Sequence, residues 1–420
     1  MKRRLPPILM TLVLVCALPI WAAFVTSGDV TNPLVCTAGA SEPNLQGMID
    51  RANAGATITL NSNTEIAATL QITKDLTLDL NGHVLKMTGD GSVLRVKKDG
   101  PDPVTLTITD SSAAKSGTIT GGNAEDGGGV YVEAYATLEM TGGCITGCRA
   151  VDGGGVYVDY NATLKMTGGC ITDCHASYGG GGIYSYENLY MGGTAKIEKC
   201  TSKWGSDDAI WNREKCNIYA DGGTVDGTVN NQGTIRRSEG AAAETVFNGT
   251  VYNRSAGTII AGIYNETVEN NGTITGGTFW GTVTNKKSAW GNEAGTIRGG
   301  TFAVTFDRSD GTKTEPTLVE WNGKVSRPTS DPEKSGHTFV GWYLGDALYD
   351  FNTPVIAPLT LTAKWEKVPS SGGNYYYHPT TDTKTDDTKG SPKTADPGVA
   401  LYAALSLLSL TGLTCATKKR

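Results

Sequence analysis

Residues 126–151 read DGGGVYVEAYATLEMTGGCITGCRAV and residues 152–177 read DGGGVYVDYNATLKMTGGCITDCHAS, so most positions recur after 26 residues. Within each unit apolar and polar residues alternate, which is the pattern of strands with one buried face. Glycine pairs separate the short strands at points where the backbone must turn tightly. One such unit cannot bury its apolar side alone, so successive units must stack. The repeat therefore predicts an all-β fold, a parallel β-helix.

Less regular units flank this pair. A third unit begins at Tyr178 and a fourth lies around Trp211, after which the repeat shortens to Gly-Thr-Ile or Gly-Thr-Val steps. These steps begin at Gly233, Gly249, Gly257, Gly272, Gly281 and Gly295. Upstream, further strands are expected at 57–60, 70–72, 76–80 and 104–108. The solenoid is predicted over residues 40–302, with about ten rungs at ~4.8 Å each and a length on the order of 50 Å.

A short amphipathic helix is expected at the start of the solenoid. It is opened by Ser41 or Asn44 and closed by Gly55, and its apolar face consists of Leu45, Met48, Ile49 and Ala52. Such a helix can cover the open end of the solenoid, where exposed strand edges would otherwise promote aggregation.

The composition excludes several classes of protein. Gly supplies 55 of 420 residues without a triplet period, which excludes collagen. Hydrophobic residues make up 39%, too many for a chain that is disordered throughout. Of the 36 Lys and Arg residues, six lie at the two ends, leaving 30 positive against 42 negative residues, or −12, between them. Nucleic acids need a basic footprint, so nucleic-acid binding is excluded.

The stretch Leu78-Asp79-Leu80-Asn81-Gly82-His83 resembles the opening rungs of pectate-lyase-like right-handed β-helix proteins. The Thr-Gly-Gly-x-Ile-Thr repeats are similar to those of bacterial surface proteins with the same fold. This resemblance implies a right-handed parallel β-helix over about residues 40–300. A fold of this kind hosts many activities, so the resemblance does not specify one.

A smaller β module is expected at residues 303–367. Gly341-Trp342-Tyr343 and Ala363-Lys364-Trp365 resemble the signatures of an internalin-type B repeat, a β-grasp-like domain of bacterial surface proteins. The resemblance implies a spacer or adhesion module without catalytic residues.

The two ends are predicted to be targeting segments. Basic residues followed by an apolar run indicate a secretory signal peptide at 1–27, with an uncleaved anchor as the alternative. Residues 368–390 lack an apolar period and are expected to form a flexible stalk. Residues 391–420 combine a short motif, an apolar stretch long enough to span a bilayer and a basic tail. Both apolar runs are expected to be helical.

This C-terminal layout resembles the cell-wall sorting signal of Gram-positive surface proteins. The motif consists of Ser391, Pro392, Lys393, Thr394 and Ala395, and it departs from the family pattern Leu-Pro-x-Thr-Gly at its first and last positions. The resemblance implies that a sortase cuts after Thr394 and links it to peptidoglycan. A plain single-span anchor is the alternative.

Four cysteines occupy equivalent positions in the two regular units: Cys144, Cys148, Cys170 and Cys174. Stacking of the units brings Cys144 near Cys170 and Cys148 near Cys174, with Cα atoms roughly 5 Å apart, which is within reach of a disulfide. Facing inward, they would instead form ladders of small apolar side chains in the core. A zinc site needs about four ligands in a tetrahedron, and no metal is predicted.

Aromatic residues recur at one strand position: Tyr131, Tyr157, Tyr184 and Trp211. The neighbouring valines and isoleucines point inward, so the rings are expected to point outward. The resulting stripe has two interpretations, a surface that stacks on sugar rings or a partner protein, and a ladder of rings that stabilise one another.

Asp207 and Asp208 are the candidate catalytic acids, because glycoside hydrolysis needs two carboxyl groups flanking the bond. They align with the glycine turns of the earlier repeats, so a polar turn is the preferred interpretation.

The sequence therefore predicts a secreted, wall-anchored adhesin that binds a glycan or a host or matrix protein along its flank. Its other partners are sortase and peptidoglycan, and no cofactor is expected. A polysaccharide lyase or hydrolase and a purely structural spacer are the alternatives.

Overall fold

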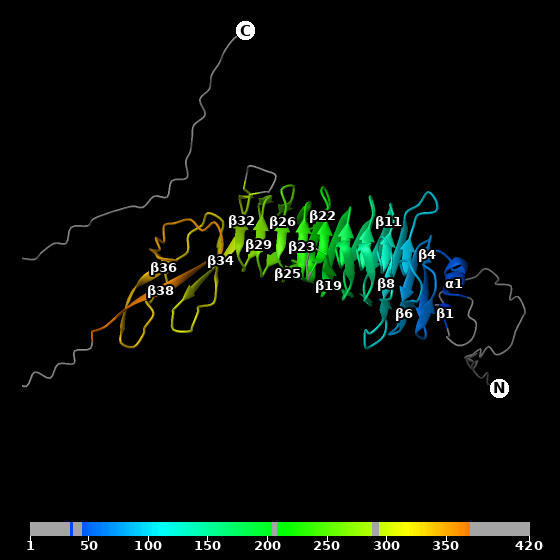
Figure 1. Ribbon diagram of the computed structural model, residues 1–420, viewed down its shortest axis with the longest axis horizontal. Coiled ribbons are helices and arrows are strands. Elements are labelled where there is room, and N and C mark those ends of the chain that lie inside the picture. The colour runs from blue at the N-terminus through cyan, green and yellow to red at the C-terminus, as the bar shows by residue number, and fades with distance from the viewer. Residues whose placement is uncertain (1–33, 37–43, 204–207, 288–293, 370–420) are drawn as a thin grey trace, which may run out of the picture. The chain divides into compact units, whose positions relative to one another are not determined.

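The computed structural model describes residues 34–36, 44–203, 208–287 and 294–369 (Figure 1). The expected signal peptide, residues 370–390 of the stalk and the sorting signal lie outside these ranges. The regular secondary structure of the described chain is almost entirely β-strand, arranged as a parallel solenoid with three long faces. The predicted all-β solenoid is therefore confirmed.

Face 1 is a ten-stranded parallel sheet. Its strands are β4 (Leu70–Ile72), β7 (Leu94–Val96), β10 (Val130–Val132), β14 (Val156–Val158), β18 (Ile183–Ser185), β21 (Asp208–Asn212), β23 (Thr228–Asn231), β26 (Val251–Asn253), β29 (Val268–Asn270) and β32 (Val283–Asn285). The 26-residue period appears directly as the register, because Val130 pairs with Val156. The period falls to 15 residues by the last pair, Val268 with Val283.

Face 2 follows face 1 in each rung. It comprises β1 (Leu34–Cys36), β2 (Ala56–Leu60), β5 (Leu76–Asp79), β8 (Val104–Thr109), β11 (Ala136–Met140), β15 (Thr163–Met166), the first parts of β19 (Asn188–Glu198) and β22 (Asn217–Asp226), β24 (Thr234–Arg236), β27 (Thr258–Ile259), β30 (Thr273–Ile274) and β33 (Thr296–Ile297).

Face 3 completes the triangle. It comprises β3 (Thr64–Ile66), β6 (Val84–Met87), β9 (Thr118–Thr120), β12 (Cys144–Thr146), β16 (Cys170–Thr172), the second parts of β19 and β22, β25 (Val246–Phe247), β28 (Ile263–Tyr264), β31 (Thr278–Phe279) and the start of β34 (Thr301–Asp307).

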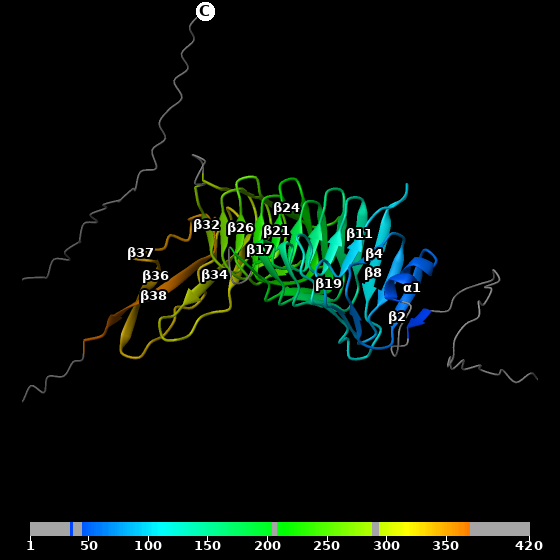
Figure 2. The same ribbon diagram turned by 45° about the vertical axis from the view of Figure 1, so that its right-hand side comes forward.

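Three consecutive long rungs carry an additional short side between face 3 and face 1. Its strands are β13 (Arg149–Asp152), β17 (His175–Gly179) and β20 (Thr201–Ser202), which form a separate parallel sheet. Figure 2 shows β17 close to β21, and these two strands contact each other. The side disappears in the shorter rungs after β21.

Inward residues of all three faces form one continuous core. In the rung of β10 the side chains of Val130, Leu138 and Ile145 are all fully buried, one from each face. In the later rungs the core contains a stack of rings, Phe247, Tyr264, Phe279 and Phe302, with centroids 4.9 to 5.4 Å apart. Burial of so much apolar surface is the main term that stabilises the solenoid.

The glycine triplets are required by the turn that leads into face 1. Gly127, Gly153 and Gly180 have φ values of +60°, +64° and +64°. A Cβ atom on Gly153 would lie 2.4 Å from the carbonyl oxygen of Val156. Only glycine fits such a position, which explains why the triplet recurs in each unit.

A ladder of asparagines, buried except for Asn285 at its end, runs along the C-terminal ends of the face 1 strands in the shorter rungs. Asn212, Asn231, Asn253, Asn270 and Asn285 are linked by Nδ2–Oδ1 hydrogen bonds of 2.7 to 2.8 Å. Asn231, Asn253 and Asn270 each also donate to a backbone carbonyl, so both polar atoms of these three amides have partners. The buried Oδ1 of Asn212, the first member, has no partner among the described residues.

The helix α1 (Leu45–Arg51) lies at the N-terminal end of the solenoid and contacts β4. Asn44 is its N-cap, accepting a 2.8 Å hydrogen bond from the Gln46 amide. The buried side chains of Leu45 and Ile49 cover the first rung.

The C-terminal module consists of β34, β35 (Thr317–Glu320), β36 (His337–Leu344), β37 (Ala347–Leu348) and β38 (Leu359–Lys367). β34 pairs with β31 of the solenoid and then with β38 of the module. The boundary expected at residue 303 therefore falls inside one continuous strand.

Candidate functional site

The repeated aromatic residues form a row on the outer side of face 1. Tyr131, Tyr157, Tyr184 and Trp211 are direct register partners on β10, β14, β18 and β21. The expected outward direction follows from the buried residues on either side of each ring, which are valines beside Tyr131 and Tyr157, and an isoleucine with Ser185 or Asn212 beside Tyr184 and Trp211. We call these four residues the aromatic ladder.

Most ring faces of the aromatic ladder are occupied by the ladder itself. Tyr157 stacks on Tyr184 at 5.7 Å between centroids, and Tyr184 stacks on Trp211 at 6.2 Å. Tyr131 meets Tyr157 edge-on at 5.2 Å, while the guanidinium of Arg95 lies 5.0 Å from its ring centroid. Tyr184 is only 2% exposed. The rings thus stack on one another, as in the second of the two interpretations of the sequence pattern, and the buried Tyr184 ring does not form part of an exposed stripe.

A second layer of side chains, which the sequence did not single out, covers the ladder. Tyr186 lies 5.4 Å from the Tyr184 ring and 4.5 Å from the ring of Tyr160. The guanidinium of Arg213 lies 5.1 Å from the Tyr186 centroid. Tyr160 is 56% exposed, and Tyr178, beside Trp211, is 43% exposed. The ring of Tyr160 is therefore the exposed ring of this second layer.

These covering residues come from the corners of the rungs. Tyr186 and Arg213 occupy successive equivalent positions just after face 1, because their amides donate to Val158 and Ser185 of the preceding rungs. Corner positions vary in residue type, since Asp159 precedes them in the same row. An alignment of the residues directly after each face 1 strand would have identified Tyr186 and Arg213, whereas the repeat within the strands does not.

A groove of about 800 Å³ lies on the same flank towards the N-terminus. Its lining includes Arg95, Tyr131 and the acidic residues Asp90, Glu125 and Asp126. Arg95 also pairs with Glu133, so the groove carries a net negative charge.

Burial and neighbouring carboxylates perturb the acids beside this groove. Burial, together with Glu125 and Asp159, raises the pKa of Asp126. Asp152, which forms a β-bridge with Asp126, is also buried enough that its pKa rises to about 6. Burial raises the pKa of Tyr131 to about 12, so its phenol stays protonated near neutral pH. The flank offers hydrogen-bond donors, protonatable carboxyls and exposed rings.

The candidate acid Asp208 lies inside the wall of the solenoid. Its carboxylate is 1% exposed and accepts hydrogen bonds from Gly180 N at 2.9 Å and Asn230 Nδ2 at 3.3 Å. Burial raises its pKa. This placement gives Asp208 a structural role in the turn and keeps it from a polysaccharide on the surface. Asp207 lies outside the described residues.

The cysteines divide into two kinds. Cys144 and Cys170 face outward, because the residues that follow them, Ile145 and Ile171, face the core. The two cysteines form a disulfide between adjacent rungs. An inward-facing ladder is therefore wrong for this pair. Cys148 and Cys174 are buried free thiols, stacked with Cys200 of the next rung. For these the core ladder is the observed arrangement.

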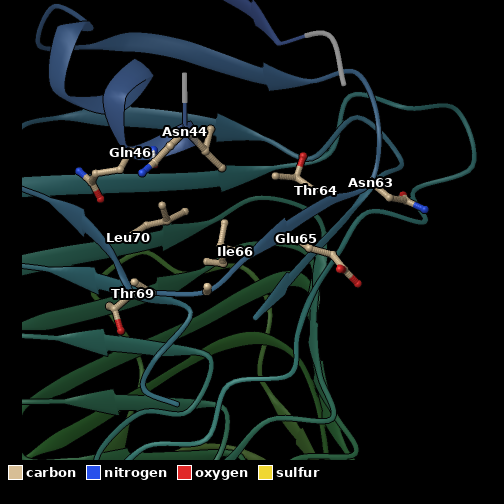
Figure 3. A pocket seen from close by; sticks show the side chains of 11 residues that line it. Asn44, Gln46, Asn63, Thr64, Glu65, Ile66, Thr69 and Leu70 are labelled. Carbon is tan, nitrogen blue, oxygen red and sulfur yellow. Dashed lines mark hydrogen bonds between the residues drawn. The ribbon is translucent and has the colours of Figure 1, made fainter. Parts of the chain in front are cut away.

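An apolar pocket of about 460 Å³ lies beside α1 (Figure 3). Leu45, Ile66 and Leu70 contribute its apolar lining, and Glu65 on its rim pairs with Lys86. This pocket therefore lacks a free charged group for acid–base chemistry among its lining residues.

Within the described ranges, no group of three or more His, Cys, Asp or Glu residues is arranged to hold a metal ion. In that same part of the chain no helix has the length and hydropathy needed to cross a membrane. The sorting motif from Ser391 to Ala395 lies outside it.

Comparison with known proteins is informative for the C-terminal module. Residues 302–364 match the family model described as the Listeria-Bacteroides repeat domain. Two curated proteins of Evansella cellulosilytica are similar, a Gly-rich membrane protein at 35% identity and a membrane protein at 33%, each over 69 residues. These alignments cover 16% of this chain and only 8% and 10% of the relatives. No solved structure matches. The repeat match and the strand-rich fold fit a repeat-containing surface protein.

Proposed function

We propose that this protein is a wall-anchored extracellular adhesin that binds a glycan on the flank formed by face 1. The observation that carries the proposal is the exposed ring of Tyr160 in the layer that it forms with Tyr186 and Arg213, together with the groove at Tyr131. Aromatic rings stack on the apolar faces of sugars, and the surrounding polar groups bind hydroxyls. The Listeria-Bacteroides repeat at 302–364 and the names of the two membrane-protein relatives support a surface location.

A glycan array with the purified protein tests this function. Tyr160→Ala combined with Tyr186→Ala removes two rings, each worth about 0.5–1.5 kcal/mol, so affinity should fall about tenfold. Tyr219→Ala is the matched control, because Tyr219 is an outward ring on face 2, stacked on Tyr190 at 4.2 Å. Equal losses in the two variants would contradict binding at face 1. An array without any binding would favour the structural spacer.

Anchoring is a separate part of the proposal. The order of motif, apolar stretch and basic tail supports attachment through Thr394 by a sortase. Thr394→Ala should convert the protein from a form that resists detergent extraction of cell walls to one that is extracted. If the variant still resists extraction, covalent attachment at Thr394 is wrong and a different anchor holds the chain.

A carbohydrate-active enzyme is the second candidate, favoured by the raised pKa values of Asp126 and Asp152 beside the groove. Protonatable carboxyl groups close together are what glycosidic bond cleavage requires. Release of reducing or unsaturated sugar ends from a polysaccharide panel, abolished by Asp152→Asn, would favour the enzyme over the adhesin.

A further inference from the structure

The last strand of face 1 has an unpaired edge. In the described part of the chain β32 has one neighbour, β29. In each preceding pair the valine N–H donates forward to the next strand: Val251 to Thr267 and Val268 to Thr282. The Asn270 carbonyl likewise accepts from Lys286. The equivalent groups of β32, the N–H of Val283 and the carbonyl of Asn285, point forward without a partner among the described residues.

The asparagine ladder ends at the same edge. Asn270 Nδ2 donates to Asn285 Oδ1 at 2.8 Å. Asn285 is exposed, and its own Nδ2 has no acceptor in the described ranges. Every earlier member of the ladder donates to an asparagine of the next rung. The end of face 1 therefore presents two backbone groups and one amide in the register of a further strand.

The opposite edge of face 1 is closed. Gln46 of α1 bonds to β4 through both atoms of its side-chain amide, with Oε1 accepting from Gln71 N at 2.7 Å and Nε2 donating to Gln71 O at 3.0 Å. At the C-terminal end β35 pairs antiparallel with β34 and so covers the edge of face 3. Proteins usually block free strand edges in such ways. Within the ranges that the structure describes, no such element covers the edge of β32.

A pocket of about 610 Å³ adjoins the open edge. Gly281 and Thr282, immediately before β32, line it together with residues of the C-terminal module. Its apolar walls include Trp280, Leu344 and Ile356, which are 41%, 45% and 59% exposed. Exposed apolar side chains gathered around a pocket typically mark an interaction site.

We propose that β32 binds an extended polypeptide segment of a partner protein as an eleventh, parallel strand of face 1. Strand addition of this kind derives affinity from main-chain hydrogen bonds and specificity from alternate side chains. Continuity with the β29–β32 ladder defines the segment: an apolar residue, any residue, then Asn, as in Val268 to Asn270 and Val283 to Asn285. A large apolar residue about three positions earlier enters the pocket, as Trp280 precedes Val283.

A second copy of this chain does not fit as the partner strand through its own solenoid end. The free edge of its face 1 is β4, and the Gln46 side chain already occupies the backbone groups of Gln71 there. The free edge fits a segment whose backbone groups are unpaired before binding, and we assign it to a flexible or terminal part of another protein.

The probe is a fluorescent peptide with the sequence of residues 280–287, Trp-Gly-Thr-Val-Thr-Asn-Lys-Lys, which has the required spacing. We expect saturable binding to the full-length protein and slowed hydrogen exchange at the amides of Val283 and Asn285. Val283→Pro removes the forward N–H without removing a bond to β29, and loss of about one hydrogen bond should weaken binding roughly tenfold. Thr284→Ala, in the same strand, keeps both forward groups and should bind normally.

Ile356→Asp changes the pocket wall and leaves the sequence of β32 intact, and it should also weaken binding. A loss of binding in this variant cannot come from a misfolded β32. Unchanged exchange at Val283 and Asn285 in saturating peptide would overturn the proposal. Equal affinity of the Val283→Pro and Thr284→Ala variants would do so too. Concentration-dependent self-association that Val283→Pro abolishes would identify a second copy as the occupant and overturn the choice of partner.

Discussion

The asparagine ladder should contribute far more to stability where it is buried than where it is exposed. In Asn253→Ala, the Oδ1 of Asn270 loses its 2.7 Å donor inside a fully buried stack. Asn231 loses one acceptor but keeps the carbonyl of Gly233. The variant thus leaves one buried carbonyl oxygen unsatisfied and creates a small cavity.

The expected cost follows from these two effects. An unsatisfied buried acceptor costs about 1–3 kcal/mol. The cavity left by an Asn side chain adds about 1 kcal/mol. We therefore expect Asn253→Ala to lower the free energy of unfolding by about 2–4 kcal/mol. This is large for one polar side chain, because the same bond in water is worth only about 1 kcal/mol.

The chain offers a matched control. Asn265 donates to Asn248 Oδ1 at 2.7 Å across neighbouring rungs, but both residues are exposed. Asn265→Ala leaves groups that water can satisfy, so the loss should stay within about 0.5 kcal/mol. Urea unfolding followed by circular dichroism, with m-values compared to test for a common transition, measures both. Equal losses in the two variants would refute the argument that burial gives the ladder its strength.

Three further predictions concern the solenoid. Cys144→Ser should lower the free energy of unfolding by about 3 kcal/mol or less, because the disulfide closes a loop of 26 residues, and reductant should have the same effect on the unmodified protein. The pKa of Asp152 is raised to about 6, so the folded protein favours the protonated carboxyl group and ionisation of Asp152 opposes folding. The contribution of Asp152 to stability is therefore fullest below pH 4 and is lost as the pH rises through 6. Asp152→Asn should consequently stabilise the protein at pH 8, by about 1 kcal/mol after solvent screening, and leave it unchanged near pH 4, as thermal unfolding at both pH values can measure. Gly153→Ala should cost clearly more than Gly240→Ala in urea unfolding, because both have positive φ but only Gly153 lacks space for a Cβ.

The period of the repeat was sufficient to predict the fold and the core. Val130 and Val132 alternate with Tyr131, and stacking at a fixed period brings like residues together in the observed register. The Gly-Thr-Ile and Gly-Thr-Val steps also indicated the later rungs. The fold can be predicted from the period because each rung places residues of the same type at the same core and surface positions.

The direction of side chains near turns was less predictable. Cys144 and Cys148 are four residues apart, yet the first faces outward and the second inward. A turn with Gly147 at φ +64° lies between them and breaks the alternation that a strand would impose. The sequence therefore left the disulfide and the core ladder open as alternatives, and each describes one of the two pairs.

The burial of Tyr184 depends on residues that no repeat predicts. Its own strand position equals that of Tyr157, but the corner of its own rung places Tyr186 beside it, where the rung of Tyr157 has Asp159. Substitution at one corner thus converts an outward ring into a buried one. In this solenoid the residues at the corners determine which outward rings are exposed, while the residues in the strands determine the core.

The change in rung length connects the fold to the proposed binding surface. The aromatic ladder and the sheet of β13, β17 and β20 occupy the same long rungs, whose additional side brings Asp152 close to the outer side of face 1. Where that side ends, Asn212 begins the asparagine ladder and the rungs contract towards 15 residues. The short rungs have fewer residues outside their three strands. The extra residues of the long rungs therefore build the flank on which we expect the ligand to bind.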